Sequence, residues 1–341
     1  MHIQDNVSLR DYSTMRLGGK ARFFSEARSE DDLKKLVDWA KKQSLPVIVV
    51  GEGSNIIWRD EGFDGLLIAN RIAGREVLEQ DSHGATIRIG AGEDWDEVVE
   101  WTVKKNLSGI EFLSAIPGRA GAAPVQNIGA YGAEIAQTLV GLTAFDTQTG
   151  DFTVIKNKAC GFAYRTSRFK SSDKSRLIIT SITLKLGKTP PAPPFYESLE
   201  KYLTDHKIKQ HTPRVIREAV IAIRAVKLPS PAKVANNGSF FTNPIIGKEE
   251  FEKLRQKYPD IKGWPQDDKV KISAGWLLEE AGFKCVHDKQ TGMATWPAQA
   301  LVLINEHAKT TADLLAFKQK IQSKVHQMSG IVLEQEPELL P

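Results

Sequence analysis

Four prolines fall within the seven residues 188–194, Lys-Thr-Pro-Pro-Ala-Pro-Pro, and they constrain the fold of this chain more than any other feature. Proline fixes φ and lacks a backbone N–H, so this segment cannot be a helix interior or a central strand. At 341 residues, the chain is also longer than one hydrophobic core usually supports. The sequence therefore predicts several domains, the last of which begins at residue 196, just after the prolines.

Helix and strand patterns alternate before the prolines. Ser29 begins a segment with a capping box and apolar residues at helical spacing, and the β-branched run Val47–Val50 follows as a strand. A second strand, Ala85–Ile89, alternates between apolar and polar residues. We expect an α+β region in two parts, residues 1–70 and residues 71–195.

The chain after the prolines carries both patterns again, which predicts a further α+β domain at residues 196–341. Thr212, Ser273 and Thr310 each stand where the cap of a helix is expected. The strands expected between and after these helices are Gly238–Phe241, Leu301–Ile304 and Ile331–Leu333.

Composition and charge exclude several classes of protein. Hydrophobic residues make up 41% of the chain and charged residues 26%, which is typical of a soluble globular protein. The net charge of +4 is scattered without a long basic block, so neither nucleic acid nor a membrane surface is an expected partner. No apolar run approaches the length of a membrane span, and the N-terminus lacks a signal pattern. Cys160 and Cys285 are too few and too far apart for a zinc site or a disulfide framework. We expect a cytoplasmic protein without a bound metal.

The segment 235–244, Ala-Asn-Asn-Gly-Ser-Phe-Phe-Thr-Asn-Pro, is a candidate functional site. Gly238 can adopt a positive φ or let a ligand approach the backbone closely. Phe240 and Phe241 are stabilising only when they pack, and their packing would hold Ser239 rigidly. A turn that enters a strand is the simpler explanation of this string taken alone. Two further segments favour a site.

Both of these segments are rich in glycine. The strand Val47–Val50 leads into Gly-Glu-Gly-Ser-Asn at 51–55, where backbone N–H groups can converge on an anion such as a pyrophosphate. The run 116–132 is small and almost uncharged, so its backbone could lie against a flat ligand. A loop packed on its own sheet has a similar composition, but Gln126, Asn127 and four glycines offer more donors than such a loop needs.

In this order, the three segments resemble the UDP-N-acetylenolpyruvoylglucosamine reductase family, the flavoenzymes of bacterial cell-wall precursor synthesis. The resemblance is to the larger family form, which has an extra tyrosine-bearing loop, and it spans nearly the whole chain. It implies an FAD-binding α+β region of the vanillyl-alcohol-oxidase-like type, in two subdomains at 1–70 and 71–195, and a substrate domain at 196–341. Further matching segments are Tyr-Ser-Thr-Met-Arg-Leu-Gly-Gly at 12–19, Gly-Phe-Ala-Tyr-Arg-Thr-Ser at 161–167, Ala-Gly-Trp-Leu at 274–277 and Gln-Ala-Leu-Val-Leu-Ile-Asn at 299–305.

The family reaction implies FAD and NADPH as cofactors and a UDP-sugar as substrate. NADPH gives a hydride to FAD, and the reduced flavin passes a hydride to the enolpyruvyl double bond, which yields UDP-N-acetylmuramate for peptidoglycan synthesis. The protein must stabilise the enolate-like charge that develops and supply a proton to the adjacent carbon. No histidine stands in the usual position for covalent attachment of the flavin, so we expect FAD to be bound noncovalently. The sequence leaves the oligomeric state open.

The resemblance assigns catalytic roles to Ser239 and Arg165. Ser239 matches the serine that donates the proton in this family. An alcohol is a poor acid in water, so it needs a charged neighbour or a proton relay. Arg165 has a planar, permanently charged side chain that suits a carboxylate or an enolate oxygen.

The third catalytic residue of the family is a glutamate near the C-terminus, and the sequence offers Glu334, Glu336 and Glu338. Because a strand has a period of two, all three could point the same way. Alignment of the family pattern from Leu333 favours Glu336. The sequence of this segment departs from the usual family pattern, which allows the alignment to be shifted by two residues. The shifted alignment would select Glu338 instead.

Binding residues also follow from the resemblance. Tyr196 stands where the larger family form has a tyrosine that folds over the substrate diphosphate, and Lys227 has the family spacing from Ser239 for a phosphate contact. Asn243 and Gln299 match amides that bind substrate. The residues expected to bind FAD are Gly51, Gly53, Ser54, Asn55, Gly118, Ala122, Gln126, Gly129 and Gly132.

Two other classes of function are weaker alternatives. An FAD-dependent oxidase or dehydrogenase with another substrate would share the first half of the chain. It would leave the matches at Tyr196, Lys227 and Ser239 unexplained. A flavin-binding module without activity would be expected to lack Arg165, Ser239 or the C-terminal glutamate. All three are present.

Overall fold

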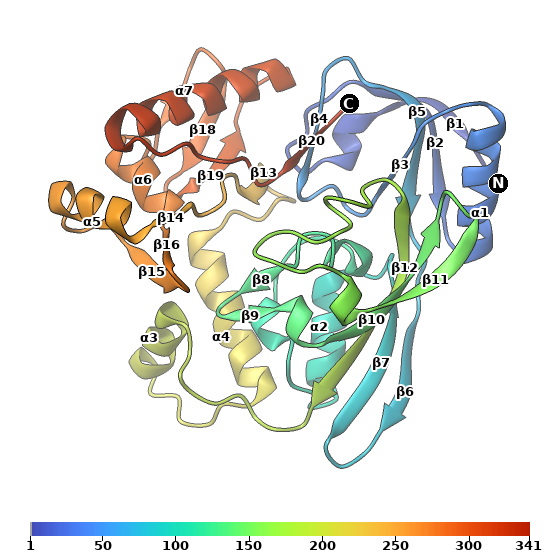
Figure 1. Cartoon of the computed structure of the whole chain (residues 1–341), viewed down its shortest axis with the longest axis horizontal. Helices are drawn as coiled ribbons and strands as arrows, with labels where there is room; N and C mark the ends of the chain where they lie inside the picture. Colours follow the sequence, from blue (N-terminus) through green and yellow to red (C-terminus); the bar gives the residue numbers. More distant parts are fainter. Residues whose placement is uncertain (1) are drawn as a thin grey trace. The chain divides into compact units, whose positions relative to one another are not determined.

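The chain divides into two compact units, and each unit combines segments from distant parts of the sequence. The computed structural model in Figure 1 describes residues 2–341. Unit 1 contains the described residues up to Val7, together with Ala21–Glu52 and Phe63–Ala225, and unit 2 contains Ser8–Lys20, Gly53–Gly62 and Val226–Pro341. The three-part division expected from the sequence stays a prediction. The two units group the chain differently, because residues 196–225 belong to unit 1.

The first sheet of unit 1 has the strand order β1-β2-β5-β3 and packs against helix α1 (Figure 1). The helix α1 (Glu30–Lys42) begins as predicted, because the Ser29 hydroxyl accepts a hydrogen bond from the backbone N–H of Asp32 at 3.0 Å. Strand β5 pairs in parallel with β2 and with β3, the predicted Val47–Val50 strand. The strands are β1 (Gln4–Ser8), β2 (Lys20–Ala27), β3 (Val47–Val50) and β5 (Phe63–Asn70).

The second sheet of unit 1 is antiparallel, with the order β11-β10-β12-β7-β6. Helix α2 (Trp95–Lys104) packs in the same core, and the Asp94 carboxylate caps it by accepting from Glu97 N–H at 3.1 Å. The strands are β6 (Arg75–Gln80), β7 (Gly84–Gly90), β10 (Leu139–Asp146), β11 (Asp151–Lys156) and β12 (Leu177–Gly187); β8 (Gly129–Ala130) and β9 (Ala133–Glu134) form a small hairpin, and short 3-10 turns lie at Glu111–Leu113, Ala120–Ala122, Ile135–Gln137 and Asn157–Ala159.

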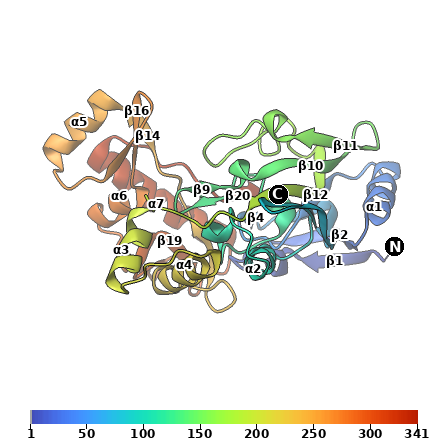
Figure 2. The same ribbon diagram turned by 90° about the horizontal axis from the view of Figure 1, so that it is seen from below.

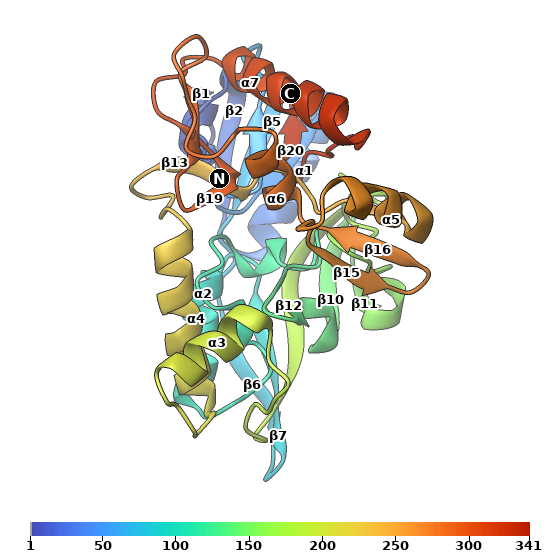
Figure 3. The same cartoon turned by 90° about the vertical axis from the view of Figure 1, so that its left-hand side faces the viewer.

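Helices α3 (Glu197–Asp205) and α4 (Pro213–Lys227) lie side by side (Figures 2 and 3) and share one apolar cluster. Phe112 and Tyr131 pack against this cluster, which explains why the two helices belong to unit 1. A partly buried ion pair adds to the attachment, because the Arg217 guanidinium on α4 donates to the Asp96 carboxylate at 2.5 and 2.9 Å.

Unit 2 has a core of strands and helices around Phe240, Phe241 and Phe317. Its main sheet has the order β13-β19-β18-β17, and a hairpin of β15 and β16 lies beside α5 (Figure 3). The 3-10 turn of this unit is Leu9–Tyr12, the helices are α5 (Lys248–Lys257), α6 (Ala274–Glu280) and α7 (Thr311–Ser329), and the strands are β4 (Ile56–Trp58), β13 (Ala235–Ser239), β14 (Ile245–Gly247), β15 (Gly263–Gln266), β16 (Lys269–Ile272), β17 (His287–Asp288), β18 (Met293–Trp296), β19 (Gln299–Asn305) and β20 (Glu338–Leu340).

The predicted strand at Ile331–Leu333 is wrong. Ile331 and Leu333 are buried and Val332 is exposed, as in a strand, but no strand among residues 2–341 pairs with them. The C-terminal strand is β20, which begins at Glu338 and pairs in parallel with β4. The pairing of β20 depends on a segment far away in the sequence, which no local pattern encodes.

Within residues 2–341, no helix combines the length and apolar character needed to cross a membrane. The same residues contain no cluster of His, Cys, Asp or Glu side chains arranged to hold a metal ion.

Candidate active site

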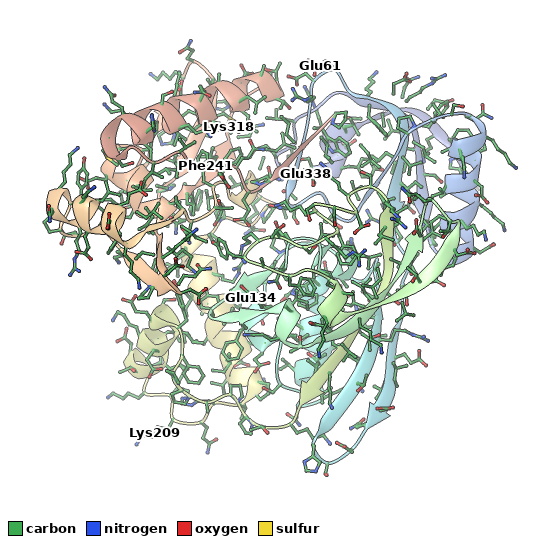
Figure 4. All side chains as sticks on the ribbon, in the orientation of Figure 1. Glu61, Glu134, Lys209, Phe241, Lys318 and Glu338 are labelled. Carbon is green, nitrogen blue, oxygen red and sulfur yellow. The ribbon has the colours of Figure 1, made fainter. Side chains whose placement is uncertain are left out.

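Ser239 ends strand β13, which pairs with β19 in unit 2. Gly238, just before it, has a φ of 71° and accommodates the irregular pairing between Asn236 and Ser239. Phe240 and Phe241 are buried, with ring centroids 5.2 Å apart, and Figure 4 shows Phe241 beneath the helix that carries Lys318. The expected packing of the two aromatics is confirmed, while the rigidity of the half-buried Ser239 stays a prediction.

The C-terminal segment runs antiparallel to the residues that follow Ser239. Glu336 N–H donates to Phe240 O at 2.9 Å, and Thr242 N–H donates to Glu334 O at 2.9 Å. The backbone of Glu336 therefore lies beside that of Phe240, one residue from Ser239. This contact joins two segments almost 100 residues apart in the sequence and brings a candidate glutamate to the candidate proton donor.

The three C-terminal glutamates lie at different places along unit 2. The chain bends at Pro337, so the even alternation expected for one strand does not extend from Glu334 to Glu338. Glu338 instead begins β20, and its N–H donates to Asn55 O at 2.9 Å. Glu336 thus stands next to the Ser239 strand and Glu338 next to the glycine-rich loop, while the Glu334 side chain is exposed. The choice of Glu336 stays a prediction.

Arg165 belongs to unit 1 and occupies a turn with a φ of 54°, which is unusual for a residue other than glycine. Its guanidinium donates to Gly129 O at 2.8 Å and lies 5.1 Å from the centre of the Tyr164 ring. Backbone strain of this kind persists where the surroundings hold it, and it is frequent at functional sites. Arg165 is therefore attached to the second glycine-rich loop, which carries the expected flavin residue Gly129.

The first glycine-rich loop requires a glycine at position 53 and leaves little room for a side chain at position 51. A Cβ at Gly53 would overlap the carbonyl oxygen of Tyr12, and the φ of Gly53 is 74°. At Gly51, a Cβ would press on the side chain of Arg119, which pairs with the Glu52 carboxylate. Ser54 and Asn55 follow and are half-buried. A left-handed residue in such a turn occurs in the backbone nests that bind anions.

The second glycine-rich loop is also held closely. Gly118 has a φ of 131° and Gly132 a φ of 84°, and a Cβ at Gly132 would meet no atom within 4 Å, which leaves open space beside the backbone. Asn127 is buried and donates to the Glu134 carboxylate at 2.7 Å, which fixes the turn between them. The first loop has the left-handed backbone suited to an anion, and the second has open space beside Gly132, so the residues of each loop taken by itself fit the part of FAD that the sequence predicts for it. The individual flavin contacts, including those of Ala122, Gln126 and Gly129, stay predictions.

A cavity of about 350 Å³ in unit 1 is lined by aromatic and small residues. The rings of Tyr131 and Tyr196 meet edge to face with their centroids 6.0 Å apart, and burial raises the pKa of both hydroxyls. The Tyr196 side chain is 45% exposed, so it is accessible for a ligand. The remaining lining residues are Gly109, Phe112, Gly132, Ala133, Gln137, Thr138, Ala192, Pro194 and Phe195.

Asn243 and Gln299 each lie against the start of helix α6 in unit 2. The Asn243 side-chain oxygen accepts from Ala274 N–H at 3.0 Å, and a Cβ at Gly275 would lie 2.9 Å from Gln299 Oε1. Both predicted substrate-binding amides therefore lie at the N-terminal end of α6, where Gly275 is small enough to let Gln299 approach. Lys227 is the last residue of α4 and is exposed.

Sequence reasoning missed Asn237, which is 6% exposed and whose side chain reaches the first glycine-rich loop. A polar residue two positions before Ser239 was part of the candidate segment. Its contacts involve residues almost 200 positions away, so its role had no local signal.

Replacement of Gly53 by valine should strongly impair FAD retention. Valine cannot adopt the required φ without strain, and its Cβ would collide with the Tyr12 carbonyl. Absorbance of the purified variant near the flavin bands, relative to protein, measures the loss. Gly150→Val serves as the control, because Gly150 also has a positive φ but lies in a turn where a Cβ meets no atom. FAD content equal in both variants would contradict the assignment of this loop.

Comparison with known proteins covers both parts of the chain. Residues 21–156 match the family described as FAD binding domain, and residues 230–340 match the family described as UDP-N-acetylenolpyruvoylglucosamine reductase, C-terminal domain. UDP-N-acetylenolpyruvoylglucosamine reductase of Alcanivorax borkumensis is 40% identical over 99% of this chain and 96% of its own. The protein of the same name from Pseudomonas putida is 37% identical over 98% of each chain. The crystal structure of this reductase from Thermus caldophilus matches with a TM-score of 0.68 and 24% identity over the full length of both chains, which supports the fold.

Proposed function

Since this chain belongs to the UDP-N-acetylenolpyruvoylglucosamine reductase family, we propose that it is an FAD-dependent oxidoreductase that reduces the enolpyruvyl group of UDP-N-acetylglucosamine enolpyruvate. NADPH is the reductant and UDP-N-acetylmuramate, a precursor of peptidoglycan, is the product. The observation that supports this proposal most is the pairing of Glu336 N–H with Phe240 O, which puts a carboxylate residue beside the Ser239 segment.

Bound FAD supplies the transfer of a hydride from NADPH to the substrate double bond. Gly51, Gly53, Ser54 and Asn55 would hold its pyrophosphate through backbone N–H groups, and Gly118, Ala122, Gln126, Gly129 and Gly132 would lie along the rest of it. We propose that the binding is noncovalent. Acid precipitation of the purified protein should then leave the flavin in the supernatant, whereas flavin that stays with the precipitate would contradict this.

The protein residues act on the substrate. Ser239 Oγ gives a proton to the carbon adjacent to the one that receives the hydride, and the lost proton must be returned from solvent or from a neighbour. Arg165 stabilises the negative charge that develops on the substrate carboxylate and enolate oxygens, because its guanidinium stays charged at every physiological pH. Glu336 assists the protonation from the segment next to Phe240. Tyr196, Lys227, Asn243 and Gln299 bind the UDP-sugar.

We also propose a cytoplasmic location. Cys160 and Cys285 are both free thiols, which fits a reducing compartment. We likewise propose that this chain is of the larger family form with a tyrosine loop. The position of Tyr196 at the edge of the cavity in unit 1 supports this.

A product assay tests this function. Oxidation of NADPH should depend on UDP-N-acetylglucosamine enolpyruvate, and mass spectrometry should find a product heavier by two hydrogens. An FAD-dependent oxidase or dehydrogenase with another substrate, the second candidate function, would oxidise NADPH or another donor without forming this product. Failure to form it with fully flavinated protein would reject the proposal.

A further inference from the structure

The Asn237 side chain connects strand β13 to the first glycine-rich loop inside unit 2. Its Nδ2 lies 3.1 Å from Thr14 Oγ1 and 3.5, 3.3 and 3.2 Å from the carbonyl oxygens of Gly53, Ser54 and Ile56. The two hydrogens of one amide are thus shared among four oxygens. Thr14 also donates its backbone N–H to Gly53 O at 3.1 Å. A single buried side chain therefore donates hydrogen bonds to three carbonyl groups of the loop.

The orientation of this amide is determined by its surroundings. Three of the four neighbours of Nδ2 are carbonyl oxygens, which can only accept, so exchanging the oxygen and nitrogen of Asn237 would place acceptors against one another. In the observed orientation, Oδ1 is buried and finds no hydrogen-bond partner among residues 2–341. A buried acceptor left without a hydrogen bond destabilises the folded chain. An arrangement that retains such a cost calls for an explanation other than stability.

The peptide geometry of the loop explains why this arrangement of Asn237 is kept. In a trans peptide, the N–H of a residue points opposite to the C=O of the residue before it. The carbonyls of Gly53 and Ser54 both point to Asn237, so the N–H groups of Ser54 and Asn55 both point away from it, on the same side of the loop. Successive N–H groups on one side form an anion-binding nest, and the left-handed Gly53, with a φ of 74°, is the conformation that produces it.

We propose that Asn237 is a positioning residue that holds the Gly53–Ile56 loop in its anion-binding conformation, and that it thereby links binding of the FAD pyrophosphate to the strand that carries Ser239. The proposal rests on the proposed function only for the identity of the anion. Asn237 itself contacts the loop and lies two residues before Ser239 on β13. Its neighbour Asn236 has a different task, because the Asn236 side chain accepts from Gly238 N–H at 2.8 Å and shapes the turn before Ser239.

Two variants separate this role from a general contribution to stability. Asn237→Ala removes the amide, and Asn237→Asp keeps its size but turns a carboxylate toward three carbonyl oxygens. The measured quantity is the dissociation constant of FAD from the deflavinated full-length protein, obtained from quenching of flavin fluorescence. A hydrogen bond makes a net contribution of about 1 kcal/mol, so we expect the alanine variant to bind FAD roughly five- to tenfold more weakly. The aspartate variant should bind FAD more weakly still, because its negative carboxylate repels the partly negative carbonyl oxygens of the loop at this distance.

Asn157→Ala is the matched control. Asn157 also bridges two carbonyls, Ala136 O at 2.7 Å and Leu139 O at 2.8 Å, but it lies in unit 1 outside both glycine-rich loops. FAD affinity unchanged in both Asn237 variants, or lowered equally in the Asn157 control, would overturn the proposal. If Asn237→Ala does not fold, Asn237→Ser keeps one donor and should show an intermediate affinity; wild-type affinity in that variant would also overturn it. Wild-type protein that binds no FAD would instead reject the proposed function.

Discussion

Replacement of Ser239 by alanine should slow reoxidation of the reduced protein by the enolpyruvyl substrate by about a hundred- to ten-thousandfold, the usual effect of losing a general acid. Reduction by NADPH should stay nearly unchanged, because the proton is needed only when the substrate accepts the hydride. Gly238 and the buried Phe240 hold the backbone of residue 239, so alanine should not change the fold of the strand.

Stopped-flow absorbance separates the two half-reactions. Ser82→Ala is a suitable control, since Ser82 is exposed in a turn of unit 1. Equal slowing of both half-reactions in Ser239→Ala would show that Ser239 positions the flavin or supports the fold, and its assignment as proton donor would fail.

The glutamate variants should differ sharply from one another. Glu336→Gln should slow the second half-reaction on the order of a hundredfold, because glutamine retains size and hydrogen bonding but loses charge and proton affinity. Glu334→Gln should have little effect, since Glu334 is exposed beside Thr242. Glu338→Gln should also be mild, because the Glu338 backbone pairs with Asn55 in the loop rather than with the Ser239 segment.

Each of the three variants removes one negative charge, so they serve as controls for one another. Rates of the second half-reaction under identical conditions decide between them. If Glu338→Gln is the slow variant, the alignment from Leu333 is shifted by two residues, and the catalytic carboxylate approaches the substrate from β20 instead.

Local features of the fold could be predicted from the sequence because their determinants lie within a few residues. The caps at Ser29, Asp94, Ser273 and Thr310 each accept a hydrogen bond from a backbone N–H three residues later. The strand Val47–Val50 and the helix that ends at Gly330 follow from apolar spacing and from the positive φ that glycine allows.

The grouping of segments into units could not be predicted in this way. Unit 2 includes Ser8–Lys20 and Gly53–Gly62, which are attached by long-range contacts such as the hydrogen bonds from Thr311 N–H to Asp60 and from the Asn305 amide to Met15 O. The same limit applies to the site. Ser239 and the glycine-rich loops stood out in the sequence, but the pairing of Glu336 with Phe240 and the bridge made by Asn237 depend on residues that meet only in the folded chain.

The most direct test of the account is an anaerobic titration followed by visible absorbance. Purified protein should be yellow, addition of one equivalent of NADPH should bleach the flavin band, and addition of one equivalent of UDP-N-acetylglucosamine enolpyruvate should restore it while UDP-N-acetylmuramate is formed. Recovery with the enolpyruvyl substrate but not with UDP-N-acetylglucosamine would confirm that the double bond is the acceptor. Colourless protein, or flavin that NADPH bleaches but the enolpyruvyl substrate does not restore, would contradict the proposed reaction.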